Sequence, residues 1–168
     1  MNTVLPALLI LTVAVNGLSG QEKRSQASMK KAVAVIASAD QLKTFSKGLQ
    51  SDPQIESFID GEIPFTIFAP ADSVFAKLPK QEVERMLGRD GFRDIGAHIL
   101  LGEKIPAKKL AVLARKEASL DNDWISRVPV KFSNEKDTLL VSGAKLIQTD
   151  IQCEGGVIHI VDALIPCK

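Results

Sequence analysis

The chain has 168 residues, which is enough for one ordinary domain and too few for two of average size. Its 21 Lys and Arg nearly balance its 20 Asp and Glu, and a dedicated nucleic-acid-binding protein would usually carry a basic excess. Apolar residues make up 45% and charged residues 24%, a mixture typical of a folded globular domain. With two His and two Cys, the chain has little material for a dense metal site or a disulfide framework.

The first 20 residues carry no charged side chain. Their apolar stretch, from Val4 to Val15, is shorter than the ~20 residues that a helix needs to cross a bilayer, and it suits the h-region of a secretory signal peptide. We therefore expect residues 1–20 to be a signal peptide and residues 21–29 a disordered polar lead. The mature chain would then be secreted (or periplasmic in a bacterium) without a permanent membrane anchor. An uncleaved apolar N-terminal anchor is the alternative.

Apolar residues at helical spacing predict a series of short helices in the first two thirds of the chain. Asp52 followed by Pro53 is typical of an N-cap and a first helical position. The run Phe65–Ala69 lies between two prolines and predicts a buried strand, after which Asp72 is expected to cap a short helix. The predicted helices cover about 32–36, 42–49, 53–59, 72–75, 80–87, 92–101 and 106–115.

From residue 128 onward the apolar pattern changes to that of strands separated by turn residues. The predicted strands cover 128–132, 138–141, 144–151 and 157–165, with turns at 134–137, 142–143 and 154–156. Helices followed by antiparallel strands predict an α+β domain over residues 30–168.

The reactive side chains give little support to catalysis. A Ser or Cys nucleophile needs a general base, and His98 and His159 are the two histidines of the sequence. His98 falls on a predicted helix and His159 among aliphatic residues of the last predicted strand, which favours hydrogen-bonded core residues in both cases. The spacing of His and Cys matches no common zinc pattern. The glycine pair Gly155-Gly156 is followed by a predicted strand, whereas a phosphate site requires a helix N-terminus there. We therefore expect no enzymatic activity, no cofactor and no metal.

Cys153 and Cys167 are an even number of cysteines in a chain with a predicted export signal, which suggests a disulfide. Across the predicted hairpin turn, however, the two would lie roughly 33 Å apart at about 3.3 Å per residue. A disulfide requires Cα atoms within about 7 Å. The geometry favours free thiols or a bond to another chain over an intramolecular bond.

Two stretches resemble the signatures of fasciclin (FAS1) domains. Phe65–Phe75 (FTIFAPADSVF) is similar to the first signature, Thr-Val-Phe-Ala-Pro-Thr-(Asn/Asp)-x-Ala-Phe. Gly156–Pro166 (GVIHIVDALIP) is similar to the second, Asn-Gly-Val-Ile-His-Val-Ile-Asp-x-Val-Leu-x-Pro, and Ala97–Leu100 between them resembles the Tyr-His or Asn-His element. The matching residues that we single out are Thr66, Phe68, Ala69, Pro70, Asp72, Phe75, His98, Gly156, Ile158, His159 and Asp162.

The resemblance implies a fold and a function. The fold would be a wedge or sandwich of β-sheets with a layer of short helices packed on it, in which the signature residues are mainly structural. The function would be that of a non-enzymatic, secreted or surface-associated interaction module for cell adhesion or for contact with a matrix or envelope. Its partners would be proteins or polysaccharides at a cell surface or matrix, or a second copy of the chain, and not nucleic acid. The alternative is a binding protein for an apolar lipid or carotenoid-type molecule, held between the helices and the sheet.

Some family members carry an Asp-Ile element just before the second signature that has been proposed to bind integrins. Asp150 and Ile151 fall at that position, but the residues themselves favour a strand end for Asp150 and a core position for Ile151. Two departures from the family pattern stand out. Ala97 replaces the usual Tyr and removes a proposed adhesion contact. Gly155 replaces the usual Asn and only loosens a turn.

Overall fold

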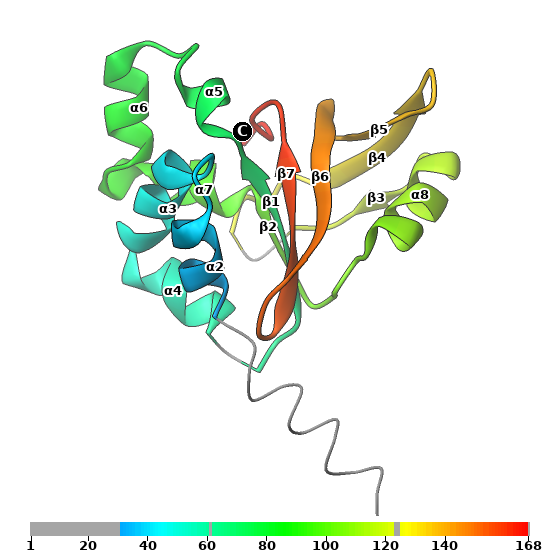
Figure 1. Cartoon of the computed structure of the whole chain (residues 1–168), viewed down its shortest axis with the longest axis horizontal. Helices are drawn as coiled ribbons and strands as arrows, with labels where there is room; N and C mark the ends of the chain where they lie inside the picture. Colours follow the sequence, from blue (N-terminus) through cyan, green and yellow to red (C-terminus); the bar gives the residue numbers. More distant parts are fainter. Residues whose placement is uncertain (1–30, 61, 123–124, 168) are drawn as a thin grey trace, which may run out of the picture.

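The structure, a computed structural model, describes residues 31–60, 62–122 and 125–167. Its frame is a curled seven-stranded sheet with the strand order β2-β1-β7-β6-β5-β4-β3. Helices gather beside β1 and β2 at one end of this sheet, and α8 lies against β4 and β5 at the other (Figure 1). The α+β fold predicted from the sequence is confirmed. The predicted signal peptide and polar lead, residues 1–29, lie outside the described residues.

Helices dominate the first part of the chain, with β1 and β2 between them, and strands dominate the second part. The strands are β1 (Phe65–Pro70), β2 (Ile99–Leu101), β3 (Ser119–Leu120), β4 (Val130–Glu135), β5 (Thr138–Val141), β6 (Ala144–Gln152) and β7 (Gly156–Val161). The helices are α2 (Ala32–Ser38), α3 (Lys43–Gln50), α4 (Pro53–Ile59), α5 (Asp72–Phe75), α6 (Lys80–Met86), the 3-10 helix η1 (Arg89–Gly91), α7 (Phe92–Gly96) and α8 (Ala107–Arg115).

The two signature stretches supply the central pair of strands, β1 and β7. They run parallel, from Phe65 opposite Gly156 to Pro70 opposite Val161, and every residue of both strands is buried. Such uninterrupted burial is typical of strands that are covered on both faces. At the start of the pair, a Cβ on Gly156 would lie 2.2 Å from Cε2 of Phe65, so only glycine lets the two strands approach this closely.

Because side chains alternate along a strand, this pair separates two hydrophobic cores. Ile67 and Ile158 point into the core beneath helices α2–α7, where Phe45 is fully buried. Phe68 points into the second core, which strands β4–β7 form with α8 and which contains Phe132. The central strand pair therefore joins both cores, with helices α2–α7 on one side and helix α8 on the other.

The predicted helix over residues 92–101 is wrong in its second half. The helix ends at Gly96, and Ile99–Leu101 form β2, which pairs antiparallel with β1. All three residues of β2 are buried. A short apolar run of this kind fits a buried strand as well as the last turn of a helix. Hydrophobic periodicity therefore cannot decide between a helix and a strand here.

The last strand is also shorter than predicted and ends at Val161 rather than at residue 165. Asp162 ends the ladder because its carboxylate takes the place of a backbone partner. The carboxylate accepts a hydrogen bond from Lys145 N at 2.7 Å, and the Asp162 N–H donates to Lys145 O at 3.0 Å.

Asp72 does not cap the helix that follows β1. It is the first residue of α5, and the N-cap is Ala71. Its carboxylate instead accepts hydrogen bonds from the backbone N–H groups of Lys43 at 3.2 Å and Thr44 at 2.7 Å, at the start of α3. The N-cap of α3 is Leu42, whose side chain has no acceptor for the unpaired N–H groups at a helix start. Asp72 therefore caps α3 from a distant part of the chain and fixes it to the end of β1.

Replacing Asp72 with Ala should lower the free energy of unfolding by about 1–2 kcal/mol, because the first turn of α3 loses its acceptor. Asp72→Asn keeps an amide oxygen and should lose less. Urea denaturation measures both, with Asp40→Ala as the control, because the Asp40 side chain is fully exposed and its ion pair with Lys43 lies in solvent, where such pairs add little stability. An Asp72→Ala variant as stable as the control would contradict this assignment.

Candidate functional site

His159 in β7 is fully buried, and the backbone holds both of its ring nitrogens. Nδ1 accepts a hydrogen bond from Asp150 N at 3.3 Å, so Nε2 carries the proton and donates to Ile105 O at 2.8 Å. The ring stacks on Phe68 with centroids 5.6 Å apart. Burial lowers the pKa of His159 below its ordinary value, which keeps the ring neutral at pH 7. This histidine joins β7, β6 and the segment before α8.

Thr66 in β1 holds the same segment from the other side. Its hydroxyl donates to Glu103 O at 2.8 Å and accepts from Ile105 N at 2.9 Å. Together with the bond from His159 to Ile105 O, these contacts satisfy the backbone between β2 and α8 and place the start of α8 against the sheet. The first and second signatures thus meet at one clamp.

Asp150 completes this clamp and is not at a strand end, contrary to the prediction. It lies inside β6 with φ of 61°, where the pairing with β7 shifts register between Gln148 and Ile151. Such a bulge needs a residue that tolerates the left-handed conformation, as Asp does. Its carboxylate accepts from Ala107 N at 2.8 Å and so caps α8, whose N-cap residue is Pro106. Ile151 is partly buried against the helical core.

His98 forms the second clamp, between α7 and the C-terminal segment. It lies between α7 and β2, and its Nδ1 donates to Asp94 O at 2.9 Å while Nε2 accepts from Ile165 N at 3.0 Å. Its own carbonyl accepts from Phe68 N at 2.8 Å, and Phe45 meets its ring edge-on. Complete burial lowers the pKa of His98 to about 4. The imidazole is therefore a neutral structural link.

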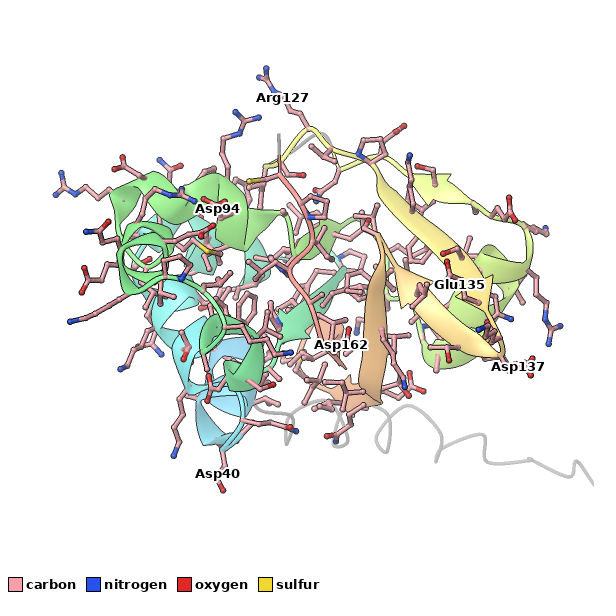
Figure 2. The ribbon with its side chains drawn as sticks, turned by 90° about the horizontal axis from the view of Figure 1, so that it is seen from above. Asp40, Asp94, Arg127, Glu135, Asp137 and Asp162 are labelled. Carbon is pink, nitrogen blue, oxygen red and sulfur yellow. The ribbon has the colours of Figure 1, made fainter. Side chains whose placement is uncertain are left out.

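The other signature residues also make internal contacts. Asp162, near the end of β7 in Figure 2, bonds the backbone of Lys145. Buried positions are occupied by Phe68, Ala69, Pro70, Phe75, Gly156 and Ile158. The structure thus brings Thr66, His159 and Asp150 together around the start of α8, and it places His98 and Asp72 elsewhere in the frame. Of the signature residues described here, Ile158 lines one of the cavities described below, and the side chains of the clamps do not.

Both cysteines are free thiols in the structure, in agreement with the geometric argument against an intramolecular bond. Cys153 is buried, and burial raises its pKa to about 11. Cys167 is partly buried and donates from Sγ to Asp94 Oδ1 at 3.0 Å. Burial and this carboxylate raise the pKa of Cys167 to about 11 as well. Neither thiol is activated as a nucleophile.

A groove with a volume of about 820 Å³ lies at the loop that carries Arg127, against β4 and the C-terminal segment, where Pro166 lines it next to Ile165 of the second clamp. Val128, Pro129 and Phe132 give it apolar walls, and Arg127 and Lys131 add positive charge. Figure 2 shows the Arg127 side chain extending outward from its loop. Sequence reasoning missed this groove because segments from distant parts of the chain line it.

The sequence instead suggested a groove between helices and sheet, lined by Leu and Phe. The cavity at that place, between α2 and strands β6 and β7, has a volume of about 210 Å³ and is lined mainly by aliphatic residues such as Ile36 and Ile158.

Metal binding and membrane crossing each require a feature that can be judged for residues 31–60, 62–122 and 125–167. Within these ranges, no three His, Cys, Asp or Glu side chains are grouped so that they could hold a metal ion. No helix in the same ranges has the length and apolar character needed to cross a membrane.

Comparison with known proteins identifies the family. Residues 28–166 match the fasciclin domain, and the chain belongs to this family. It is 30% identical over 167 residues to protein sll1483 of Synechocystis sp., a match that covers 95% of this chain and 89% of that protein. It is 24% identical to the transforming growth factor-beta-induced protein ig-h3 of Sus scrofa, over 66% of this chain, and 28% identical to human periostin, over 78%. These two matches span only 16% and 15% of those longer proteins.

A solved structure shows the same fold. The FAS1 domain pair of the insect cell adhesion molecule fasciclin I matches with a TM-score of 0.64, covering 82% of this chain and 51% of that one. At 15% sequence identity, this likeness concerns the fold alone.

The lowered pKa of His98 predicts a loss of stability in acid. Its pKa is about 4 in the folded protein, against an ordinary value of 6.5. Between these pH values the unfolded chain binds a proton at His98 that the folded protein does not bind. The free energy of unfolding is therefore highest above pH 6.5 and falls as the pH drops toward 4. His98 should account for about 3 kcal/mol of this fall, and His159 should add to it in the same direction.

Urea denaturation at several pH values between 7 and 4 measures this dependence. His98→Gln removes the titrating group and should give a shallower dependence, although the variant starts from a lower stability. A wild-type free energy of unfolding that does not change between pH 6.5 and 4 would contradict the neutral, buried state of His98.

Proposed function

We propose that the chain is a secreted or surface-associated, non-enzymatic interaction module that mediates cell adhesion or contact with an extracellular matrix or envelope. The observation that carries this proposal is that the reactive side chains of the domain are hydrogen-bonded to its own backbone. His98 and His159 each use both ring nitrogens on backbone partners, and the Asp150 carboxylate caps α8. Such groups serve the frame, and binding is left to the exterior. Membership of the fasciclin family, with its domain pair in an insect cell adhesion molecule, supports an interaction module in general.

This proposal gives the Asp150-Ile151 element a structural role. Asp150 is an exposed residue, so its role is judged from the bonds that it makes inside the fold. One carboxylate oxygen of Asp150 already accepts from Ala107 N, and its backbone N–H donates to His159. Ile151 faces Ile158 in the sheet. We therefore place adhesive contacts on other parts of the surface.

Export is supported by the charge-free first 20 residues and their short apolar stretch. The partner would be a protein or polysaccharide at a cell surface or matrix, or a second copy of the chain. Because bridging two surfaces requires two binding sites, a single fasciclin domain would need to self-associate or to carry a second site.

Expression in the native host tests this function. The chain should be recovered outside the cell membrane with an N-terminus near residue 21, and the purified protein should bind host cells or matrix in a saturable manner. Light scattering reports self-association, and protein unfolded at low pH serves as the control. Two results would contradict the proposal. One is a chain that stays inside the cell, and the other is a purified protein that binds no cell or matrix surface and does not self-associate.

A second candidate function is the binding of an apolar small molecule. The groove of about 820 Å³ with apolar walls favours it, since its volume falls in the range of small-molecule sites. Absorbance and mass spectrometry of an organic extract, made from protein purified from its own host, are the direct measurement. A colourless and lipid-free protein would remove this candidate.

A further inference from the structure

The positive charge of the chain is concentrated in one segment. Residues 104–116 hold five cations, Lys104, Lys108, Lys109, Arg115 and Lys116, and no acidic residue. Subtracting these five from the 21 Lys and Arg leaves 16 cations against 20 anions, so the rest of the chain has a net charge of −4. The overall charge of +1 is therefore the sum of a strongly basic segment, residues 104–116, and a net negative charge on the rest of the chain.

Helix α8 places two of these cations, Lys108 and Arg115, on one exposed face. Leu110 and Ala114 are buried against the sheet. Lys108 and Arg115 are exposed and seven residues apart, so they lie on the same face of the helix about 10.5 Å apart along its axis. Val112 lies between them and is 45% exposed. We call the exposed side chains of Lys104, Lys108, Val112, Arg115 and Lys116 the α8 basic face.

The charges of the α8 basic face form no ion pair within the described residues, although Arg115 lies in the last turn of α8, where the helix dipole favours a cation. Lys109 pairs with Glu103, but Lys104, Lys108, Arg115 and Lys116 have no ion pair in the described part of the chain. Lys108 also lies in the first turn of α8, where the helix dipole disfavours a cation, and that turn contains no acidic residue. A cation placed against the dipole and without a partner does not stabilise the fold, which points to a role outside it.

We infer that the α8 basic face binds an acidic polysaccharide, an inference that rests on the proposed extracellular function and gives it a partner and a surface. A row of cations along one helix matches the regularly spaced anions of a linear chain. The net negative charge elsewhere opposes a broad polyanion such as a membrane plane, because exposed charges act over roughly 8–10 Å at physiological salt. Val112 is the one apolar side chain on this face, too little to anchor the helix in lipid.

The test compares two double variants of the full chain. Lys108→Gln with Arg115→Gln removes two charges of the α8 basic face, and Lys47→Gln with Lys77→Gln removes two exposed cations elsewhere. The probes are heparin, as a sulfated chain, and alginate, as a carboxylated chain, with binding measured by calorimetry across a salt series. The α8 variant should bind at least ~10-fold more weakly near 0.15 M salt, and its salt slope should fall by about 2, one for each lost contact.

The control variant should bind within about twofold of the wild type, and the thermal midpoint of the α8 variant should not fall below that of the control. The inference is overturned if the wild type binds neither probe, or if both variants weaken binding equally. It is also overturned if the wild type prefers duplex DNA or anionic phosphatidylglycerol vesicles to both polysaccharides.

The same variants separate this inference from the proposed function. If the α8 variant still attaches to host cells or matrix as the wild type does, the proposed function stands and the α8 basic face is not its binding surface. If the wild type binds heparin through α8 but attaches to no host surface, the proposed function fails, and the inference that the α8 basic face binds an acidic polysaccharide is retained.

Discussion

The parallel contact between β1 and β7 determines where the other elements can lie. It joins two stretches from opposite ends of the domain and buries every side chain of both strands, so that each strand faces two cores. Close contact depends on Gly156, whose missing side chain leaves room for Phe65. Once this pair has formed, Thr66 lies two positions along the ladder from His159, and the two residues together hold the segment before α8.

Burial of such a frame creates a second constraint, because the backbone groups at its margins must find partners. Two helices begin at residues whose side chains cannot cap them, and distant aspartates supply the acceptors: Asp72 for α3 and Asp150 for α8. The histidines do the same for strand and loop backbone. The polar signature residues are thus explained by hydrogen-bond satisfaction within the fold, and the exterior, the α8 basic face above all, remains for partners.

The sequence predicted much of this fold because β1, β7 and most helices carry strong local patterns between clear turn residues. It failed at β2, where Ile99–Leu101 are too short a run to reveal a period. It also misplaced the caps, because Asp72 and Asp150 serve N–H groups far away along the chain, and no local spacing records such a pairing. The role of His159 as a buried, hydrogen-bonded residue was accessible from its aliphatic neighbours, but its partner, Ile105 O, was not.

The central claim is that both histidines are neutral clamps held by the backbone, and ¹⁵N NMR of the imidazole rings tests it most directly. At pH 7 the two rings should show opposite tautomers. His98 should be protonated at Nδ1, since Nε2 accepts from Ile165 N, and His159 at Nε2, since Nδ1 accepts from Asp150 N. Both signals should remain in slow exchange with solvent. Rings that exchange between tautomers, or that titrate near pH 6.5, would contradict the account.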